Sequence, residues 1–208
     1  MQRFSNSKLV VFLDRDGVLN QNVGYLSDIA RIVPTGVGHA IARAVNASKL
    51  RYAVISNQPI VATGQATFRQ IEVLTREVLR MNGFLEFHDA PIYICPHLPT
   101  SRKGGYDSDL IVDCTCRKPK PGLIFKALSD LGIDPKNIIF IGDSIVDVEA
   151  GLAAKVNTLH IHLRPSELCD TNVNLLCMDE EDVLTTLNEF SIEYIALMFK
   201  GAEIDGQG

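Results

Sequence analysis

The chain has 208 residues, of which 46% are hydrophobic and 22% are charged, and its formal net charge is -5. This length and composition predict one globular unit with a well-buried core and exclude a disordered chain. The acidic balance disfavours a nucleic-acid partner, which would be met by a basic surface. No apolar run approaches the roughly 18–20 residues that cross a bilayer, and the N-terminus does not resemble a secretory signal. We therefore expect a cytoplasmic protein without a membrane partner.

Short apolar runs alternate with segments of helical periodicity along the chain. The runs that we expect to form strands are Leu9–Leu13, Tyr52–Ile55, Ile92–Cys95, Ile138–Ile141 and Thr158–Ile161. Apolar residues at helical spacing predict helices around Val37–Val45, Ile71–Met81 and Ile124–Leu131. Strands that alternate with helices predict a doubly wound α/β fold with a mostly parallel sheet, in which ligands bind beyond the carboxyl ends of the strands.

We interpret the chain as a single domain over residues 1–208. Its core is expected at about residues 8–163. A loop without periodicity, at about residues 95–116, interrupts the alternation of strands and helices. The C-terminal extension, at about residues 164–208, has weaker patterns and is expected to hold one helix from Asp179 to about Phe190.

Two carboxylates, Asp14 and Asp16, follow the first predicted strand directly. At this spacing they can share a hard cation such as Mg²⁺ while Asp14 attacks a phosphorus atom and becomes an aspartyl-phosphate. Asp16 can protonate the leaving oxygen and later activate water. The short pattern also occurs in ordinary Asp-rich turns and in calcium loops, so it needs partners elsewhere in the chain.

Those partners are expected at the same edge of the sheet, because Ser56, Asn57 and Asp143 also follow predicted strands directly. In order along the chain, the motifs resemble those of the haloacid dehalogenase superfamily of phosphatases. The motif residues are Asp14–Val18 (DRDGV), Ser56, Lys118 and Gly142–Asp147 (GDSIVD). The resemblance implies a phosphatase core, and the spacing of the motifs leaves no room for a large cap domain.

The substrate side of this site would be formed by hydrogen-bond donors and positive charge. Ser56 and the neighbouring Asn57 can bind the phosphate oxygens, and Lys118 offers its charge to the phosphate and to Asp14. Arg117, next to Lys118, would also face the substrate. A small soluble phosphorylated sugar is the expected partner.

The metal side of the site would be formed by carboxylates. The resemblance implies that Asp143 completes the coordination of Mg²⁺ by Asp14 and Asp16, with Asp147 as a supporting group. Asp143 is also placed to cap the helix that follows it, and the two roles are compatible.

A second cluster of ligand residues precedes Lys118. It consists of Cys95, His97, Cys114 and Cys116. Three thiolates and one imidazole suit a structural Zn²⁺ that holds the loop. The alternative, three core cysteines and a surface histidine, would not explain why these residues lie so near Lys118. The cluster and the stretch Arg117–Lys120 resemble the zinc loop of the D-glycero-D-manno-heptose-1,7-bisphosphate 7-phosphatases, which histidinol-phosphate phosphatases share. The other cysteines, Cys169 and Cys177, are expected to be buried thiols.

Two further stretches favour the heptose enzymes. Asn20–Leu26 resembles their opening motif, and Asn57–Gly64 resembles their N-Q-[SP]-x-[IV]-A-R-G loop, except that Thr63 replaces the arginine. The resemblance implies removal of the C7 phosphate of a heptose 1,7-bisphosphate, in the supply of nucleotide-activated heptose. Histidinol phosphate or another small monoester is the alternative substrate. A catalytically silent zinc-stabilised binding module and a DNA-end phosphatase are less favoured, and we expect a monomer.

Overall fold

The computed structural model describes residues 9–102, 107–161, 174–189 and 192–205. The strands of this part of the chain are β1 (Val10–Leu13), β2 (Arg51–Asn57), β3 (Ile92–Cys95), β4 (Ile138–Gly142), β5 (Asn157–Ile161) and β6 (Leu175–Met178). They form one parallel sheet in the order β3-β2-β1-β4-β5-β6. The predicted doubly wound α/β fold is therefore confirmed.

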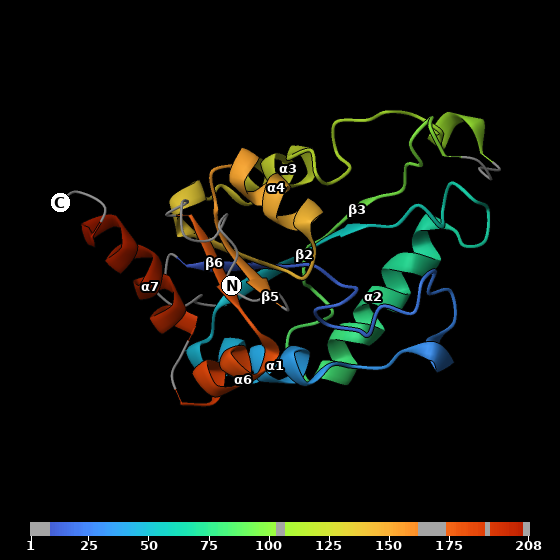
Figure 1. Ribbon diagram of the computed structural model, residues 1–208. Helices are drawn as coiled ribbons and strands as arrows, with labels where there is room; N and C mark the ends of the chain where they lie inside the picture. Colours follow the sequence, from blue (N-terminus) through green and yellow to red (C-terminus); the bar gives the residue numbers. More distant parts are fainter. Residues whose placement is uncertain (1–8, 103–106, 162–173, 190–191, 206–208) are drawn as a thin grey trace.

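Helices cover both faces of this sheet (Figure 1). They are α1 (Gly36–Ser48), α2 (Phe68–Asn82), α3 (Gly122–Leu131), α4 (Ile145–Ala153), α6 (Glu180–Glu189) and α7 (Ile192–Asp205), with short 3₁₀ turns η1 (Ile29–Arg31), η2 (Ser108–Leu110) and η3 (Pro135–Asn137). Helices α3 and α4 pack on one face, whereas α1, α2, α6 and α7 lie on the other.

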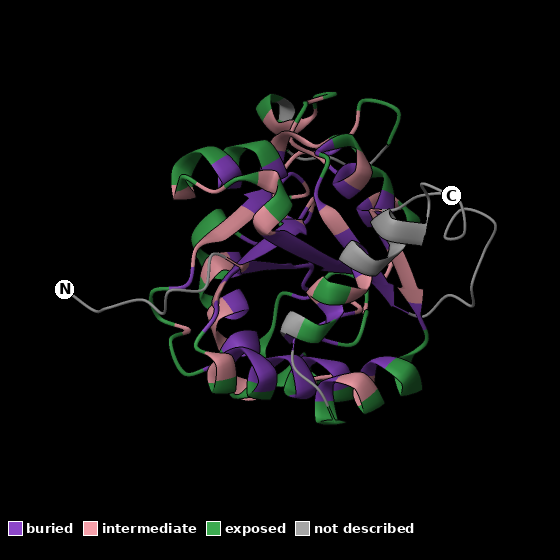
Figure 2. Cartoon of the chain, turned by 90° about the vertical axis from the view of Figure 1, so that its left-hand side faces the viewer, coloured by how far each residue is buried: buried purple, intermediate pink, exposed green. Residues whose placement is uncertain are grey.

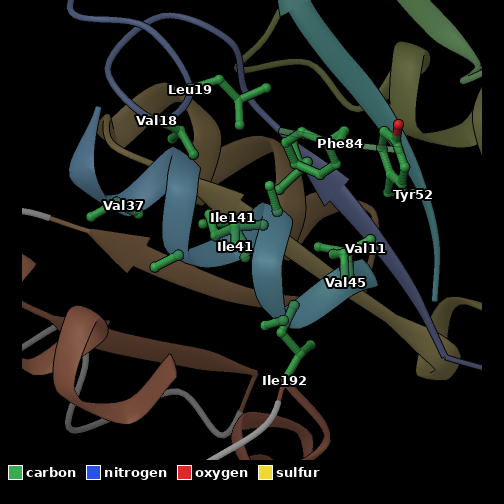
Figure 3. Close-up of a cluster of buried hydrophobic side chains, with 14 of the residues drawn as sticks. Val11, Val18, Leu19, Val37, Ile41, Val45, Tyr52, Phe84, Ile141 and Ile192 are labelled. Carbon is green, nitrogen blue, oxygen red and sulfur yellow. The ribbon is translucent and has the colours of Figure 1, made fainter. Parts of the chain in front are cut away.

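The two faces of the sheet bury alternate residues of each strand. Val11 of β1 belongs to the cluster under α1, and the next residue, Phe12, belongs to the cluster under α3 and α4. In Figure 3, Val45 of α1 lies beside Val11, and Ile41 lies beside Ile141 of β4. Figure 2 shows the central strands buried between helices whose outer surfaces are exposed, whereas β3 and β6 are partly half-buried. Burial on both faces explains why these strands are continuous apolar runs in the sequence.

Local signals fix where several helices begin and end. Thr67 and Gln70 form a capping box at the start of α2, and the Thr35 side chain caps α1. Gly83 and Gly132 follow α2 and α3 in the left-handed conformation that ends a helix. These caps delimit the helices that flank the candidate site.

The C-terminal part holds more structure than the sequence indicates. Helix α6 agrees with the predicted helix, but β6 extends the sheet and α7 packs against α1. Cys177 in β6 is half-buried and disulfide-bonded, so the expectation of a buried thiol is wrong there. Cys169 and Phe190 lie outside the described residues.

The topology creates a switch point between β1 and β4. The crossover after β1 runs through α1 on one face, and the crossover before β4 runs through α3 on the other face. Residues 14–35 and 58–67, which follow β1 and β2, contain turns, isolated β-bridges and η1, so these two segments of the described chain hold no large cap. None of the helices described combines the length and apolar character that a membrane crossing requires.

Candidate active site

Polar residues meet at the carboxyl edge of the sheet, beside the switch between β1 and β4. Asp14 follows β1 directly, and its backbone N–H donates to the carbonyl of Ile141 in β4 (2.9 Å). Ser56 and Asn57 end β2, and Asp143 follows β4. The parallel pairing of β2, β1 and β4 therefore brings these segments to the place where ligands bind in doubly wound sheets.

Lys118 enters this site from the loop before α3 and is almost completely buried, with 3% of its surface exposed. Its Nζ atom donates to Oδ1 of Asp14 (2.7 Å) and to the carbonyl of Ile55 (2.9 Å), and it lies 2.5 Å from Oδ1 of Asp147. Its Nζ atom also lies 5.5 Å from the centre of the Phe140 ring. Burial alone would lower the pKa of Lys118, but the two carboxylates raise it, so the side chain keeps its charge.

The Asp14 carboxyl is in an environment with excess negative charge. Burial raises its pKa to about 8, an effect that Lys118 opposes and that the carboxylates of Asp147 and Asp16 reinforce. The Lys118 ammonium therefore offsets only in part the combined effect of burial and the two neighbouring carboxylates on the pKa of Asp14. A bound cation would favour the ionised form of Asp14, which is the form that acts as a nucleophile.

Asp14, Asp143 and Asp147 form a carboxylate cluster, in which one oxygen of each residue lies within 4.8 Å of the others. Gly17 makes room for it, because a β-carbon at that position would lie 1.8 Å from Oδ2 of Asp143. The φ angle of Gly17 is also positive, at +91°, which strains residues that carry a side chain. Convergent carboxylate oxygens of this kind suit a hard divalent cation such as Mg²⁺.

The Asp16 side chain is not part of this carboxylate cluster, because two buried residues hold it in another direction. Arg15 donates from Nε to Oδ1 of Asp16 (3.1 Å) and from Nη2 to Oδ2 (2.7 Å). Gln58 donates from Nε2 to the same Oδ2 (2.8 Å). Asp147, predicted as a supporting group, thus takes the place in the cluster that we predicted for the side chain of Asp16.

Arg15 and Gln58 are functional candidates that sequence reasoning missed. Arg15 is completely buried and Gln58 is 3% exposed, and Gln58 also donates to the hydroxyl of Ser56 (2.9 Å). A charged residue between two aspartates is ordinarily assigned to the surface, and no periodicity shows that it is buried. The available signal was position, since Arg15 lies within the DRDGV motif and Gln58 within the Asn57–Gly64 loop motif.

The predicted phosphate-binding residues differ in their hydrogen-bond partners and in their burial. Asn57 donates to the carbonyl of Lys118 and accepts from its N–H, each at 3.0 Å, so it ties β2 to the Lys118 loop. Arg117 is half-buried and donates to the carbonyl of His97 (3.2 Å). The Ser56 hydroxyl is buried beside the site, with 2% of the residue exposed.

The four predicted zinc ligands come together at the end of β3 and in the loop before α3. Each offers one ligand atom within 4.8 Å of the others: Cys95, His97, Cys114 and Cys116. The sulfur atoms lie 3.3 to 3.7 Å apart, and Nδ1 of His97 lies 3.2 Å from Sγ of Cys116. Thiolates bound at about 2.3 Å to one tetrahedral zinc ion would lie about 3.8 Å apart. The cluster is therefore compact enough for a single ion.

Comparisons with known proteins agree with this geometry. Residues 115–162 match a family model for HAD-hydrolase-like proteins. A D-glycero-beta-D-manno-heptose-1,7-bisphosphate 7-phosphatase of Haemophilus influenzae is 37% identical over 150 residues, which cover 70% of this chain and 77% of that protein. The chain belongs to this phosphatase family. A D-glycero-alpha-D-manno-heptose-1,7-bisphosphate 7-phosphatase of Photorhabdus laumondii is 33% identical over 184 residues, covering 84% of this chain and 97% of that protein.

The phosphatase also shares its fold with a solved structure of the same enzyme type. The D,D-heptose 1,7-bisphosphate phosphatase of B. bronchiseptica, solved with magnesium and phosphate, matches with a TM-score of 0.66 and 22% identity, covering 87% of this chain and 97% of that chain. At this identity the match bears on the fold alone. The two proteins therefore share their overall fold.

The phosphatase departs from the heptose loop motif at Thr63, and the structure shows what this side chain does. Its hydroxyl donates to the carbonyl of Ile60 (2.8 Å), and its N–H donates to the carbonyl of Pro59 (3.2 Å). The hydrogen bonds of Thr63 are therefore made within its own turn. An arginine at this position would add a cation that the turn lacks.

Proposed function

We propose that this phosphatase removes the C7 phosphate of a heptose 1,7-bisphosphate through an aspartyl-phosphate on Asp14. The observation that carries the proposal is the buried Asp14 carboxyl, 2.7 Å from the Lys118 ammonium and next to two further carboxylates at the switch point of the sheet. The names of the relatives supply the sugar, and they include both anomers of the bisphosphate. The whole chain acts as one catalytic domain in this proposal.

The chemical steps follow from the roles of two carboxyl groups. An oxygen of Asp14 attacks phosphorus, the bond from phosphorus to the sugar oxygen breaks, and the Asp16 carboxylic acid gives its proton to that oxygen. The Asp16 carboxylate then takes a proton from water, and the water oxygen attacks phosphorus. The bond to Asp14 breaks, which releases inorganic phosphate and leaves both carboxyl groups in their starting states.

Basic and polar groups stabilise the phosphate during both steps. Lys118 holds the attacking oxygen of Asp14 through its ion pair and adds positive charge beside the phosphate. The Ser56 hydroxyl and the guanidinium of Arg117 are the further donors that we assign to the phosphate oxygens. Asn57 acts through Lys118, whose backbone it holds from both sides.

A magnesium ion fits the donor set at this edge. Arg15 pairs with Asp16, and Lys118 pairs with Asp14 and Asp147, in a part of the chain where four carboxylates gather. A divalent cation suits the three carboxylates that converge there. We assign Asp14 and Asp143 as ligands, with Asp147 next to them and Asp16 on the substrate side. When bound, Mg²⁺ would neutralise repulsion between the carboxylates and the phosphate. The magnesium and phosphate bound by the structural relative support this assignment.

Zinc fits the second cluster, where three thiols and one imidazole converge at the end of β3. Burial raises the pKa of the Cys95 thiol, so a bound cation would be needed to hold it as the thiolate. A zinc ion held by Cys95, His97, Cys114 and Cys116 would join β3 to the segment that leads into Lys118. Its proposed role is to position that segment. A cytoplasmic location and a monomeric state remain predictions from the sequence.

The experiment that tests this function is phosphate release from a substrate panel. The panel holds both anomers of heptose 1,7-bisphosphate, histidinol phosphate and fructose 1,6-bisphosphate, with D14N as the blank. Preference for one heptose anomer, lost with EDTA and restored by Mg²⁺, is the expected result. Preference for histidinol phosphate would move the enzyme to that substrate and overturn the heptose assignment. Activity that survives complete removal of divalent cations would overturn the metal assignment.

A further inference from the structure

Arg15 is a fully buried cation whose hydrogen bonds are directed at one catalytic carboxyl group. Its Nε and Nη2 atoms form a fork to the two oxygens of Asp16, at 3.1 and 2.7 Å. Its Nη2 also donates to Oε1 of Gln58 (2.8 Å), and its Nη1 donates to the hydroxyl of Thr75 in α2 (3.4 Å). Arg15 and Thr75 are both 0% exposed, so solvent does not compete for these bonds.

Gln58, which follows β2 directly, also holds Asp16. Its Nε2 atom donates to Oδ2 of Asp16 (2.8 Å) and to the hydroxyl of Ser56 (2.9 Å), and its backbone N–H donates to the carbonyl of Cys95 (2.7 Å). Both oxygens of Asp16 are therefore engaged by rigid buried groups. The side chain of Asp16 is still 19% exposed, which leaves it a face toward the site.

We propose that Arg15, with Gln58 and Thr75, is a positioning group that holds the Asp16 carboxyl in the orientation from which it exchanges a proton with the leaving oxygen and with water. This inference rests on the proposed function, in which Asp16 is the acid and base. A planar guanidinium fork fixes a carboxylate in two dimensions, which a single ammonium cannot do. Thr75 and Gln58 fix the guanidinium in turn, because they accept from two of its other N–H groups.

The alternative is that Arg15 only ties the loop after β1 to α2. The two roles differ in how the rate depends on the leaving group. Sugar phosphates leave as poor alkoxides and need the proton from Asp16, whereas p-nitrophenolate leaves without one. A misplaced Asp16 therefore slows phosphoryl transfer to Asp14 selectively for sugar phosphates, although it slows the later water step for both substrates. A structural defect slows phosphoryl transfer from both substrates alike.

The test compares R15M with wild type in the rate of the first turnover, which reports formation of the aspartyl-phosphate, on the heptose bisphosphate and on p-nitrophenyl phosphate. Loss of positioning should lower the first-turnover rate with the sugar phosphate by roughly 100-fold and leave that with p-nitrophenyl phosphate within about 3-fold. R76M is the matched control. Arg76 lies on α2 and bonds to the carbonyls of Phe87, His88 and Ala90, away from Asp16. R76M should leave the ratio of the two substrates unchanged.

A double-mutant cycle with D16N decides whether Arg15 acts through Asp16. In the D16N background, R15M should cause no further loss with the sugar phosphate. If R15M does not fold, R15K and T75V carry the same test, since each loosens the fork while keeping the buried volume. Equal losses of the first-turnover rate on both substrates, or losses of R15M and D16N that multiply in the cycle, would overturn the inference. Wild-type inactivity on every panel substrate would instead overturn the proposed function.

Discussion

The Nζ atom of Lys118 lies 2.7 Å from Oδ1 of Asp14, although 104 residues separate the two in the sequence. Both side chains are buried, and the same ammonium lies 2.5 Å from Asp147. The contact joins the end of β1 to the loop that carries the cysteine and histidine cluster. It makes the proposed nucleophile depend on the position of that loop.

Replacing Lys118 should show how much this ion pair contributes to the free energy of unfolding and to turnover. K118M leaves two buried carboxylates without their cation, so the free energy of unfolding should fall by about 3–5 kcal/mol, and turnover should be lost. Urea denaturation measures the first effect and phosphate release the second. K126M is the control, because the Lys126–Asp130 pair (2.9 Å) is solvent-exposed and its loss should change stability by less than about 0.5 kcal/mol. If K118M and K126M had the same free energy of unfolding, the stabilising role of the buried ion pair would be contradicted.

Gly17 should be required for metal binding because Asp143 lies against it. In G17A the β-carbon would displace the Asp143 carboxylate, so the Mg²⁺ concentration for half-maximal activity should rise roughly 10–100-fold. Gly24 is the matched control: it also has a positive φ, of +76°, but nothing lies within 4 Å of its missing β-carbon. G24A should introduce backbone strain without a steric clash, so its Mg²⁺ dependence should stay that of the wild type. The same Mg²⁺ dependence in both variants would show that Asp143 is not a ligand.

The cysteine and histidine cluster should hold one zinc ion that stabilises the fold. C114S should lower both the bound zinc, measured by atomic absorption, and the melting temperature, because a structural zinc site contributes folding free energy. T115A changes the exposed residue between Cys114 and Cys116 and should leave both quantities unchanged. Wild-type zinc content in C114S would refute a site with four protein ligands.

Much of the fold could be predicted because the strands are buried on both faces. The predicted strand at Tyr52–Ile55 lies inside β2, and the one at Ile138–Ile141 lies inside β4. Strand β6 and helix α7 were missed. Strand β6 is only four residues long, and α7 has weak helical periodicity, so their partners in the tertiary structure decide what they form.

The site could be predicted as a set of strand ends, but not as a set of side-chain directions. The alternating pattern predicts a doubly wound parallel sheet, and the observed order of its strands brings Asp14 and Asp143 together. Whether Asp16 or Asp147 joins them depends on bonds made by Arg15 and Gln58. Those bonds arise between segments far apart in the sequence, which no local spacing records.

The most direct test of the central claim is to trap the phosphorylated residue. Enzyme mixed with substrate and Mg²⁺ is quenched in acid and treated with borohydride, which reduces an acyl phosphate of aspartate to homoserine, and peptides are then read by mass spectrometry. We predict homoserine at position 14 in the wild type and none in D14N, which should remain folded but inactive. Rapid phosphate release with no trapped residue, or trapping at another carboxylate such as Asp143, would contradict Asp14 as the nucleophile.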